Sequence, residues 1–328
     1  MAETFLSKPV VKTPEPLVPI ILIRHLVLGM TFLTLFLMAL GSATRVMNAG
    51  LACPDWPLCY GELVPRQQMN LQVFLEWFHR LVASTLGLLA IAFAGLAWGF
   101  RRALPAWLPA SATFALGLVI LQGVLGGLTV TQLLRFDVVT AHLGAGLLFF
   151  CTMLTIGMAL IPYRGTGVIG HLPWFSLAAV ISVYLQSLLG GLAASRWALH
   201  QCLGTSQLCG VMHSHFLGVV PAGLSTLLLV FLAWRTPALH PLLRRLAHLA
   251  VGLLGLQLIL GMSIFWLHLQ VPLLTVAHQA VGATLLGSLV AFSVIAIRDR
   301  LQASHLDIIQ QEKIQQDGNL EDSPPVLS

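Results

Sequence analysis

This sequence carries very little charge. Only 9% of its 328 residues are Asp, Glu, Lys or Arg, whereas 57% are hydrophobic. A soluble domain carries roughly 25% charged residues, so most of this chain is not expected to face water. The polar segment before the first apolar run contains Glu3 and Glu15 and lacks an arginine-rich amphipathic pattern. These features argue against a cleaved signal peptide or a mitochondrial transit peptide and favour a bacterial membrane.

Long apolar runs are abundant where charge is scarce. Eight of them are long enough to cross a bilayer, which requires about 20 residues per helix. The sequence therefore predicts an all-α, polytopic membrane protein in which eight transmembrane helices form two pseudo-symmetric four-helix bundles. The predicted spans are roughly residues 24–45, 72–98, 107–132, 138–161, 173–195, 210–234, 246–267 and 273–297.

The basic residues are divided unequally between the two sets of predicted helix ends. Twelve of the 17 lie at one set and five at the other. Because cytoplasmic loops are enriched in Lys and Arg, this bias places both termini on the cytoplasmic side of a bacterial inner membrane. It also accounts for the net charge of +5 without a nucleic-acid partner. The twelve are Lys8, Lys12, Arg24, Arg101, Arg102, Arg164, Arg235, Arg244, Arg245, Arg298, Arg300 and Lys313, and the five are Arg45, Arg66, Arg80, Arg135 and Arg196.

The two halves of the chain repeat each other. His79 and His142 are 63 residues apart, and so are His215 and His278 (142 − 79 = 278 − 215 = 63). A repeat of this kind indicates a duplicated four-helix unit. The predicted organisation is a cytoplasmic segment 1–23, an N-terminal half 24–161, a cytoplasmic linker 162–172, a C-terminal half 173–297 and a disordered cytoplasmic tail 298–328.

Glutamine and glycine also recur at equivalent places. Span three contains QGVLGG from Gln122, span five contains QSLLGG from Gln186, and span seven contains QLILGM from Gln257. Small residues allow helix backbones to approach closely in lipid. Helix packing alone would explain these motifs.

The four repeated histidines are candidate haem ligands. Two histidines at one depth on two helices of a bundle can hold one haem iron axially, and an ionisable residue inside a span is a functional candidate by default. The alternative is simple hydrogen bonding between helices. His213 lies two residues before His215, roughly 200° around the helix, and cannot face the same ligand, so the choice of His215 rests on the repeat spacing.

A carboxylate accompanies the histidines in the first half alone. Glu76 precedes His79 by three residues and Arg80 by four, so all three project from neighbouring positions of one helix. Glu76 could handle protons beside a haem bound by His79. Alternatively, Glu76 and Arg80 form an ion pair that neutralises both charges. Arginines at this end, Arg45, Arg80 and Arg196, are candidate partners for haem propionates.

Four of the five cysteines lie in two loops on the predicted outer side. Cys53 and Cys59 are in the first outward loop of the chain, and Cys202 and Cys209 are in its third outward loop. Cys151 lies inside span four. An oxidising compartment would allow each loop to close a disulfide, Cys53–Cys59 and Cys202–Cys209. The alternative is that both spacings are coincidental.

Two motifs resemble hallmarks of the haem A synthase family. They are Glu76-x-x-His79-Arg80 and the loop from Leu51 to Gly61, which reads LACPDWPLCYG. The resemblance covers all eight predicted spans and implies the oxidation of a ring methyl of haem O, by two hydroxylations, to the formyl group of haem A.

By the same resemblance, the two halves have different tasks. His215 and His278 would hold a resident haem b, and His79 and His142, with Arg80, would line the site of the substrate haem. Glu76 would serve the oxidation there. Haem O synthase is then a candidate donor of the substrate. The electron acceptor, the use of the loop cysteines and the formation of a homo-oligomer stay open.

Three other classes of membrane protein share some of these features. A di-haem electron-transfer protein would use the four histidines but has no use for a carboxylate in one half only. A thiol–disulfide oxidoreductase would use the loop cysteines but leaves the histidine repeat unexplained. A transporter would account for the repeat, but no span shows an interrupted centre.

Overall fold

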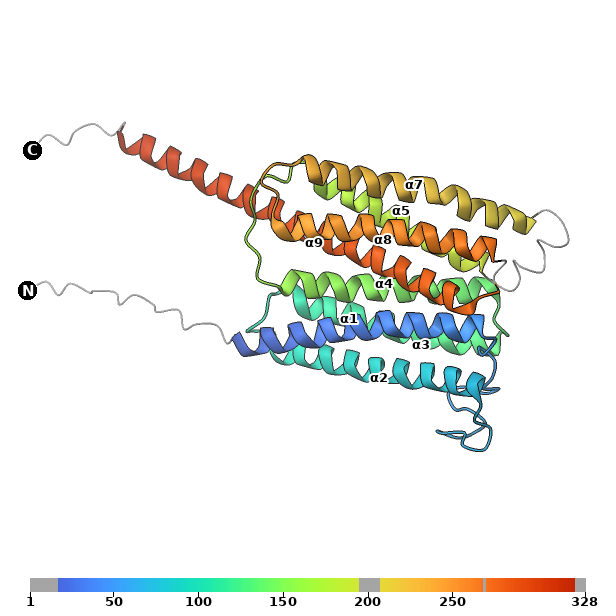
Figure 1. The fold of residues 1–328 in the computed structure, drawn as a ribbon. Coiled ribbons are helices and arrows are strands. Elements are labelled where there is room, and N and C mark those ends of the chain that lie inside the picture. The colour runs from blue at the N-terminus through green and yellow to red at the C-terminus, as the bar shows by residue number, and fades with distance from the viewer. Residues whose placement is uncertain (1–16, 195–206, 268–269, 322–328) are drawn as a thin grey trace, which may run out of the picture.

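The protein is a bundle of long α-helices. The computed structural model describes the backbone of residues 17–194, 207–267 and 270–321, and the side chains of residues 18–194, 210–267 and 270–304. Within these ranges eight helices run side by side (Figure 1), each long and apolar enough to cross a membrane. The prediction of an all-α protein with eight spans is confirmed. The helices are α1 (Leu17–Val46), α2 (Leu71–Gly99), α3 (Trp107–Thr131), α4 (Phe136–Leu160), α5 (Leu172–Ala193), α7 (Gln207–Arg235), α8 (Pro241–Trp266) and α9 (Pro272–Glu321).

The helices form two four-helix bundles with the same internal order. In the first half, α1 and α3 each pack against both α2 and α4. In the second half, α5 and α8 each pack against both α7 and α9. Helices α1 to α4 therefore correspond to α5, α7, α8 and α9, as the duplicated sequence predicts. The two pseudo-symmetric bundles are confirmed.

Helix α9 is the central element that joins the two halves. It packs against α1 and α4 of the first half as well as against α5 and α8 of its own. Its spanning window is 72% buried, whereas those of the other helices are 11–39% buried. Phe150 of α4 lies against Gly287 of α9, where a Cβ would come within 2.9 Å of the ring. A small residue at this crossing brings the two backbones together.

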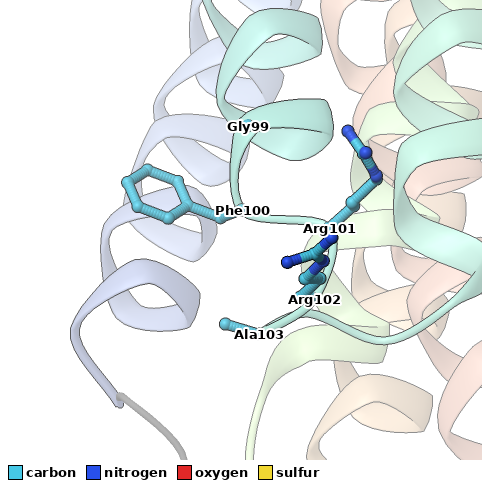
Figure 2. A pocket seen from close by; sticks show the side chains of 5 residues that line it. All are labelled: Gly99, Phe100, Arg101, Arg102 and Ala103. Atoms are coloured by element: carbon cyan, nitrogen blue, oxygen red, sulfur yellow. The ribbon is translucent and has the colours of Figure 1, made fainter.

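The two ends of the bundle differ. Helix α1 begins, and α9 leaves the bundle, at the same end (Figure 1), called the terminal end below. The turn from Gly99 to Ala103 also lies there, and it lines a shallow pocket with Arg101 and Arg102 (Figure 2). The opposite end, called the loop end, holds the long connection between α1 and α2.

The linker between the halves is fastened to α9. The buried carboxylate of Asp299 accepts hydrogen bonds from the Tyr163 hydroxyl (2.6 Å) and from the backbone N–H groups of Thr166 (2.9 Å) and Gly167 (2.8 Å). Arg298 donates to two carbonyl oxygens at the end of α4. Burial and the bond to Asp299 raise the pKa of Tyr163. The linker is therefore an ordered part of the fold.

The predicted disordered tail is wrong as far as Glu321. Helix α9 continues without a break to that residue. No proline interrupts the chain between Pro272 and Pro324, and residues 298–321 are rich in Gln and Leu, which favour helix. It also extends a helix that has already formed, which avoids the cost of nucleation. A prediction of disorder from composition uses the low hydrophobicity of the segment and takes no account of helix propensity or of the helix that precedes it.

Candidate functional site

Four histidines lie against glycines in a pattern that repeats in both bundles. His79 lies on α2, His142 on α4, His215 on α7 and His278 on α9, and all four are partly buried. The described helix before each of them supplies a glycine at the point of contact, so the ring edge lies on bare backbone. A Cβ on Gly41, Gly126, Gly190 or Gly261 would come within 3.0, 3.5, 2.9 or 3.1 Å of the Cε1 atom of His79, His142, His215 or His278, respectively.

The two histidines of each half influence each other electrostatically. His79 is within electrostatic range of His142, and His278 is within electrostatic range of His215. Adjacent His213 is exposed, whereas His215 is partly buried against α5. The geometry thus favours His215 over its neighbour.

The surroundings of these rings fit a haem better than a zinc ion. The Nδ1 atoms of His79, His142 and His278 are buried and have no hydrogen-bond partner among the described residues. Buried polar atoms are nearly always partnered, and a neutral imidazole without a partner keeps a lone pair or a proton available. Two imidazoles in each half suit the two axial positions of a haem iron, whereas zinc takes three or four protein ligands.

Glutamines reach the histidines from the neighbouring helices. The Nε2 atom of Gln122 donates to the backbone carbonyl of His142 (3.0 Å). That of Gln186 lies 3.0 Å from Nδ1 of His215, and it donates to the carbonyl of the same residue (2.8 Å). The Nε2 atom of Gln257 lies 3.2 Å from Nε2 of His278. The sequence motifs interpreted as packing elements therefore also contact the candidate ligands.

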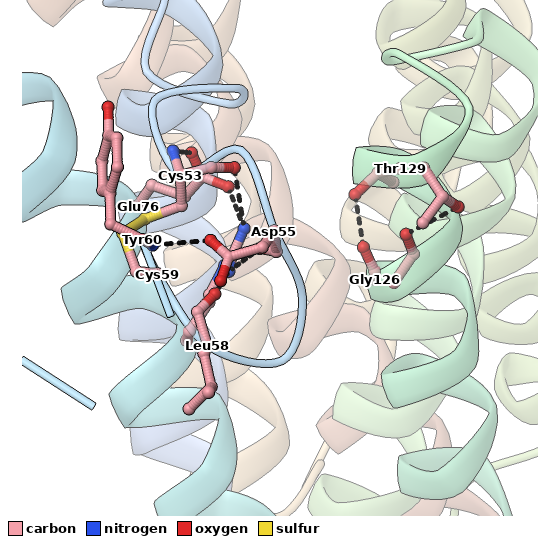
Figure 3. Close-up of polar contacts among 11 residues, drawn as sticks. Cys53, Asp55, Leu58, Cys59, Tyr60, Glu76, Gly126 and Thr129 are labelled. Carbon is pink, nitrogen blue, oxygen red and sulfur yellow. Dashed lines mark hydrogen bonds and ion pairs between the residues drawn. A yellow bond between two sulfur atoms is a disulfide. The ribbon is translucent and has the colours of Figure 1, made fainter. Parts of the chain in front are cut away.

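Glu76 and Arg80 hold the first loop onto α2, and Figure 3 shows Glu76 beside Cys53 of this loop. Arg80 pairs with Oε1 of Glu76 at 2.5 Å, so the ion pair considered in the sequence analysis is present. Oε2 of Glu76 accepts from the backbone N–H of Cys53 (2.8 Å). Arg80 also donates to the carbonyls of Asp55 and Leu58, both at 2.6 Å. The buried carboxylate is therefore held on both oxygens.

The loop above this clamp is closed by a disulfide. Cys53 and Cys59 are bonded, as predicted, and both are buried. The Asp55 carboxylate accepts from the N–H groups of Tyr60 (2.6 Å) and Gly61 (2.7 Å). These bonds, that from Gly61 foremost, hold the pKa of Asp55 below its usual value. The turn is thus fixed by one covalent bond and by a charged acceptor.

The same loop also reaches across to α3. The ring of Trp56 lies on Gly127, where a Cβ would come within 3.3 Å of it. Gly127 follows Gly126, the glycine that contacts His142. The loop therefore connects the helix that carries His79 to the helix that supports His142, at the loop end of the first half.

Arg45 lies between the two halves. Its Nη2 atom donates to the side chain of Gln279 on α9 (3.3 Å), the residue that follows His278, and its Nε atom is buried without a partner among the described residues. Its predicted pairing with a haem propionate stays a prediction. Arg196 and Cys202 lie outside the described residues. Cys209 lies in the first turn of α7, with its side chain outside the described set, so the Cys202–Cys209 pair also stays a prediction.

Comparison with known proteins identifies the family. A family model described as COX15-CtaA, cytochrome oxidase assembly protein, matches residues 24–290. The chain belongs to the COX15-CtaA family. The match covers parts of all eight helices and all four histidines, so both halves are COX15-CtaA-like, and the protein is a multi-pass membrane protein.

Relatives in this family bear an enzyme's name. A protein of Shewanella oneidensis called heme A synthase is 29% identical over 310 residues, which cover 79% of this chain and 92% of that protein. Another heme A synthase, from Caulobacter vibrioides, is 29% identical over 317 residues, which cover 78% and 91%. A protoheme IX farnesyltransferase of Chloroflexus aurantiacus is 35% identical over 147 residues, which cover 44% of this chain and 24% of that protein.

Several residues that contact the histidines or hold the first loop were not predicted to do so. The glutamines and glycines recur with the histidines, and this shared period was the signal that could have joined them. Trp56 and Asp55 carried no comparable signal, because the partner of each is fixed only by the folded loop.

Proposed function

We propose that this protein is a haem A synthase. It oxidises a ring methyl of haem O to a formyl group, through two hydroxylations and loss of water from the geminal diol, and supplies haem A for terminal oxidases. The observation that carries this proposal is the match, over both halves, to proteins called heme A synthase. The repeated histidine sites support it.

In this proposal the second half, residues 173–297, holds a resident haem b. His215 and His278 would hold it, and the glutamine amides beside the two imidazoles suit such a group. When bound, this haem supplies one-electron transfer. The second half contributes no carboxylate beside its histidines, and electron transfer needs none.

The first half, residues 24–161, would bind haem O between His79 and His142. Oxidation of a methyl group to a formyl group removes electrons and releases protons, so a proton acceptor is needed near the reacting carbon. Glu76 is the buried carboxylate beside His79, and Arg80 and the N–H of Cys53 fix its two oxygens. The clamp keeps this proton acceptor in place beneath the disulfide loop.

The surroundings of the enzyme follow from the same proposal. The excess of basic residues at the terminal end favours a bacterial cell membrane with both termini in the cytoplasm. Haem O synthase, which farnesylates protohaem IX, is the proposed substrate donor, and the local similarity to a protoheme IX farnesyltransferase supports it. The electrons pass to an acceptor outside this chain.

The test is pigment extraction with mass analysis after expression beside a source of haem O. Haem A is expected with the wild-type chain. With Glu76→Gln, haem A should be lost while haem b is retained, because the substitution keeps the size of the side chain and removes the proton acceptor. Haem b without haem A in the wild type would indicate the di-haem electron-transfer alternative. Activity in a haem-free preparation would indicate the thiol–disulfide alternative.

A further inference from the structure

The glutamines are placed in one register relative to the histidine sites. In α3, α5 and α8 a glutamine stands four residues before the glycine that supports the histidine, at Gln122, Gln186 and Gln257. Four residues are about one helical turn, so glutamine and glycine share a face. In α1 the equivalent position, four residues before Gly41, is Leu37. Three of the four histidine sites therefore have a glutamine at this position, and the site of His79 has a leucine.

The contacts of these glutamines differ between the two halves of the protein. In the second half both glutamines reach an imidazole ring, Gln186 at Nδ1 of His215 (3.0 Å) and Gln257 at Nε2 of His278 (3.2 Å). In the first half Gln122 reaches only the backbone carbonyl of His142 (3.0 Å). Leu37 has no polar group to offer His79.

Unpartnered atoms in the second half complement each other. Oε1 of Gln186 and Oε1 of Gln257 are buried acceptors without a partner among the described residues, and Nδ1 of His278 is a buried nitrogen without one. A carbonyl oxygen beside an imidazole can accept the ring N–H, which fixes the tautomer and leaves the other nitrogen for a metal ion. Each ring of this half therefore has a glutamine amide group next to one of its nitrogens, Nδ1 in His215 and Nε2 in His278.

The first half lacks this arrangement. Nδ1 of His79 and Nδ1 of His142 are buried and unpartnered in the described part of the chain. Gln122 donates to the backbone carbonyl of His142, as Gln186 does to that of His215, but within the described residues it makes no hydrogen bond to the His142 ring. Within the described residues, each ring of this half rests against a glycine, and its Nδ1 atom has no hydrogen bond.

We infer that Gln186 and Gln257 are positioning residues that hold both histidines of the second half for a permanently bound haem, and that the unheld rings of the first half permit haem exchange. An enzyme that converts one haem into another must release its product. The haem in the substrate site must therefore dissociate from its ligands in each catalytic cycle, whereas a haem cofactor stays bound. This assignment rests on the proposed function and deepens it.

The experiment compares Gln186→Met and Gln257→Met with a matched control, Gln122→Met, in the purified full-length protein. Methionine keeps the length and removes the amide. Transfer of haem b to excess apomyoglobin gives the dissociation rate, and electron paramagnetic resonance of the ferric haem reports the orientation of the two imidazoles. Loss of an outer hydrogen bond to a histidine ligand costs roughly 10–100-fold in affinity. We expect haem b to leave faster by that order in the first two variants, with a changed spectrum, and at the wild-type rate in the control.

The converse substitution is Leu37→Gln. It places in α1 the residue that the three other helices carry at this position, and it should slow the transfer of haem from the first half without changing haem b. As a second pair, Gln186→Asn and Gln257→Asn keep an amide but shorten it, and should shift the haem b rate in the same direction as the methionine variants.

The outcomes separate the two proposals. Wild-type protein that retains haem b, together with Gln186 and Gln257 variants that release it at the wild-type rate, would overturn the positioning role and leave the enzyme assignment standing. Equal acceleration in all three methionine variants would also overturn it, because a general loss of packing would then be the cause. Wild-type protein without any histidine-bound haem would overturn the proposed function itself.

Discussion

The closest approach between a histidine and its glycine makes Gly190→Ala the most informative single substitution. A Cβ at this position would lie 2.9 Å from Cε1, 3.4 Å from Nδ1 and 3.6 Å from Nε2 of His215, so it meets the whole ring. Carbon atoms in contact prefer about 3.5–4.0 Å. The ring must therefore retreat by about 0.6 Å or more, and the resulting strain is about 1–3 kcal/mol.

The control is Gly223→Ala, in the same helix as His215. A Cβ there meets nothing within 4 Å. Both substitutions replace glycine by alanine inside a helix and share a gain of roughly 1 kcal/mol from helix propensity. The difference between the two variants therefore isolates the contact with the ring.

The assay measures haem b per chain after purification, its rate of transfer to apomyoglobin, and the thermal midpoint of the full-length protein. We expect Gly190→Ala to lose haem b roughly 10-fold faster, which corresponds to about 1.4 kcal/mol at 25 °C, while Gly223→Ala behaves like the wild type or is slightly more stable. Equal haem loss in the two variants, or none in either, would refute the reasoning that the bare backbone of Gly190 is needed for the ring.

Three further predictions concern the first half and its loop. Gly41→Ala, with its Cβ 3.0 Å from the ring, should weaken haem binding in the first half more than Gly126→Ala, where the distance is an ordinary 3.5 Å; titration with haem after removal of bound pigment compares them. Arg80→Met should cost about 3–5 kcal/mol, because it leaves a buried carboxylate unpaired, and should appear as faster hydrogen exchange at residues 53–61. The contribution of Asp55 to loop stability is present above the unfolded pKa of about 3.9 and is lost as the pH falls through its lowered folded pKa; Asp55→Asn should abolish that dependence in exchange measured between about pH 3 and 5.

The arrangement of helices was predictable from the sequence because the bilayer imposes a length that few other environments require. Apolar runs of that length identified every helix. Most of their ends differ from the structure by a few residues, but α1 begins at Leu17 instead of 24 and α9 continues to Glu321 instead of ending at 297. The equal spacing of the histidines indicated the duplication, because insertions inside a packed bundle are rarely tolerated. Both the length of the apolar runs and the spacing of the histidines can be read from the sequence without a structure.

The contacts within the site depend on rotation and depth, which the sequence leaves open. That Gln186 and Gln257 reach a ring while Gln122 reaches a carbonyl depends on small differences in helix placement. The position of Trp56 on Gly127 depends on the path of a loop without regular structure. The predicted disorder of residues 298–321 is wrong because continuity with a formed helix outweighs the composition of this segment.

The central position of α9 has a consequence for the history of this fold. Helices α4 and α9 occupy equivalent places and pack against each other, and the contact of α1 with α9 has its counterpart in that of α5 with α4. A single four-helix unit would leave the contact surface of this fourth helix uncovered. A second copy of the unit, related by a two-fold rotation, covers it. The ancestor that best fits this geometry is a self-paired half-length protein, later fused into one gene, after which each copy was able to diverge toward its own task.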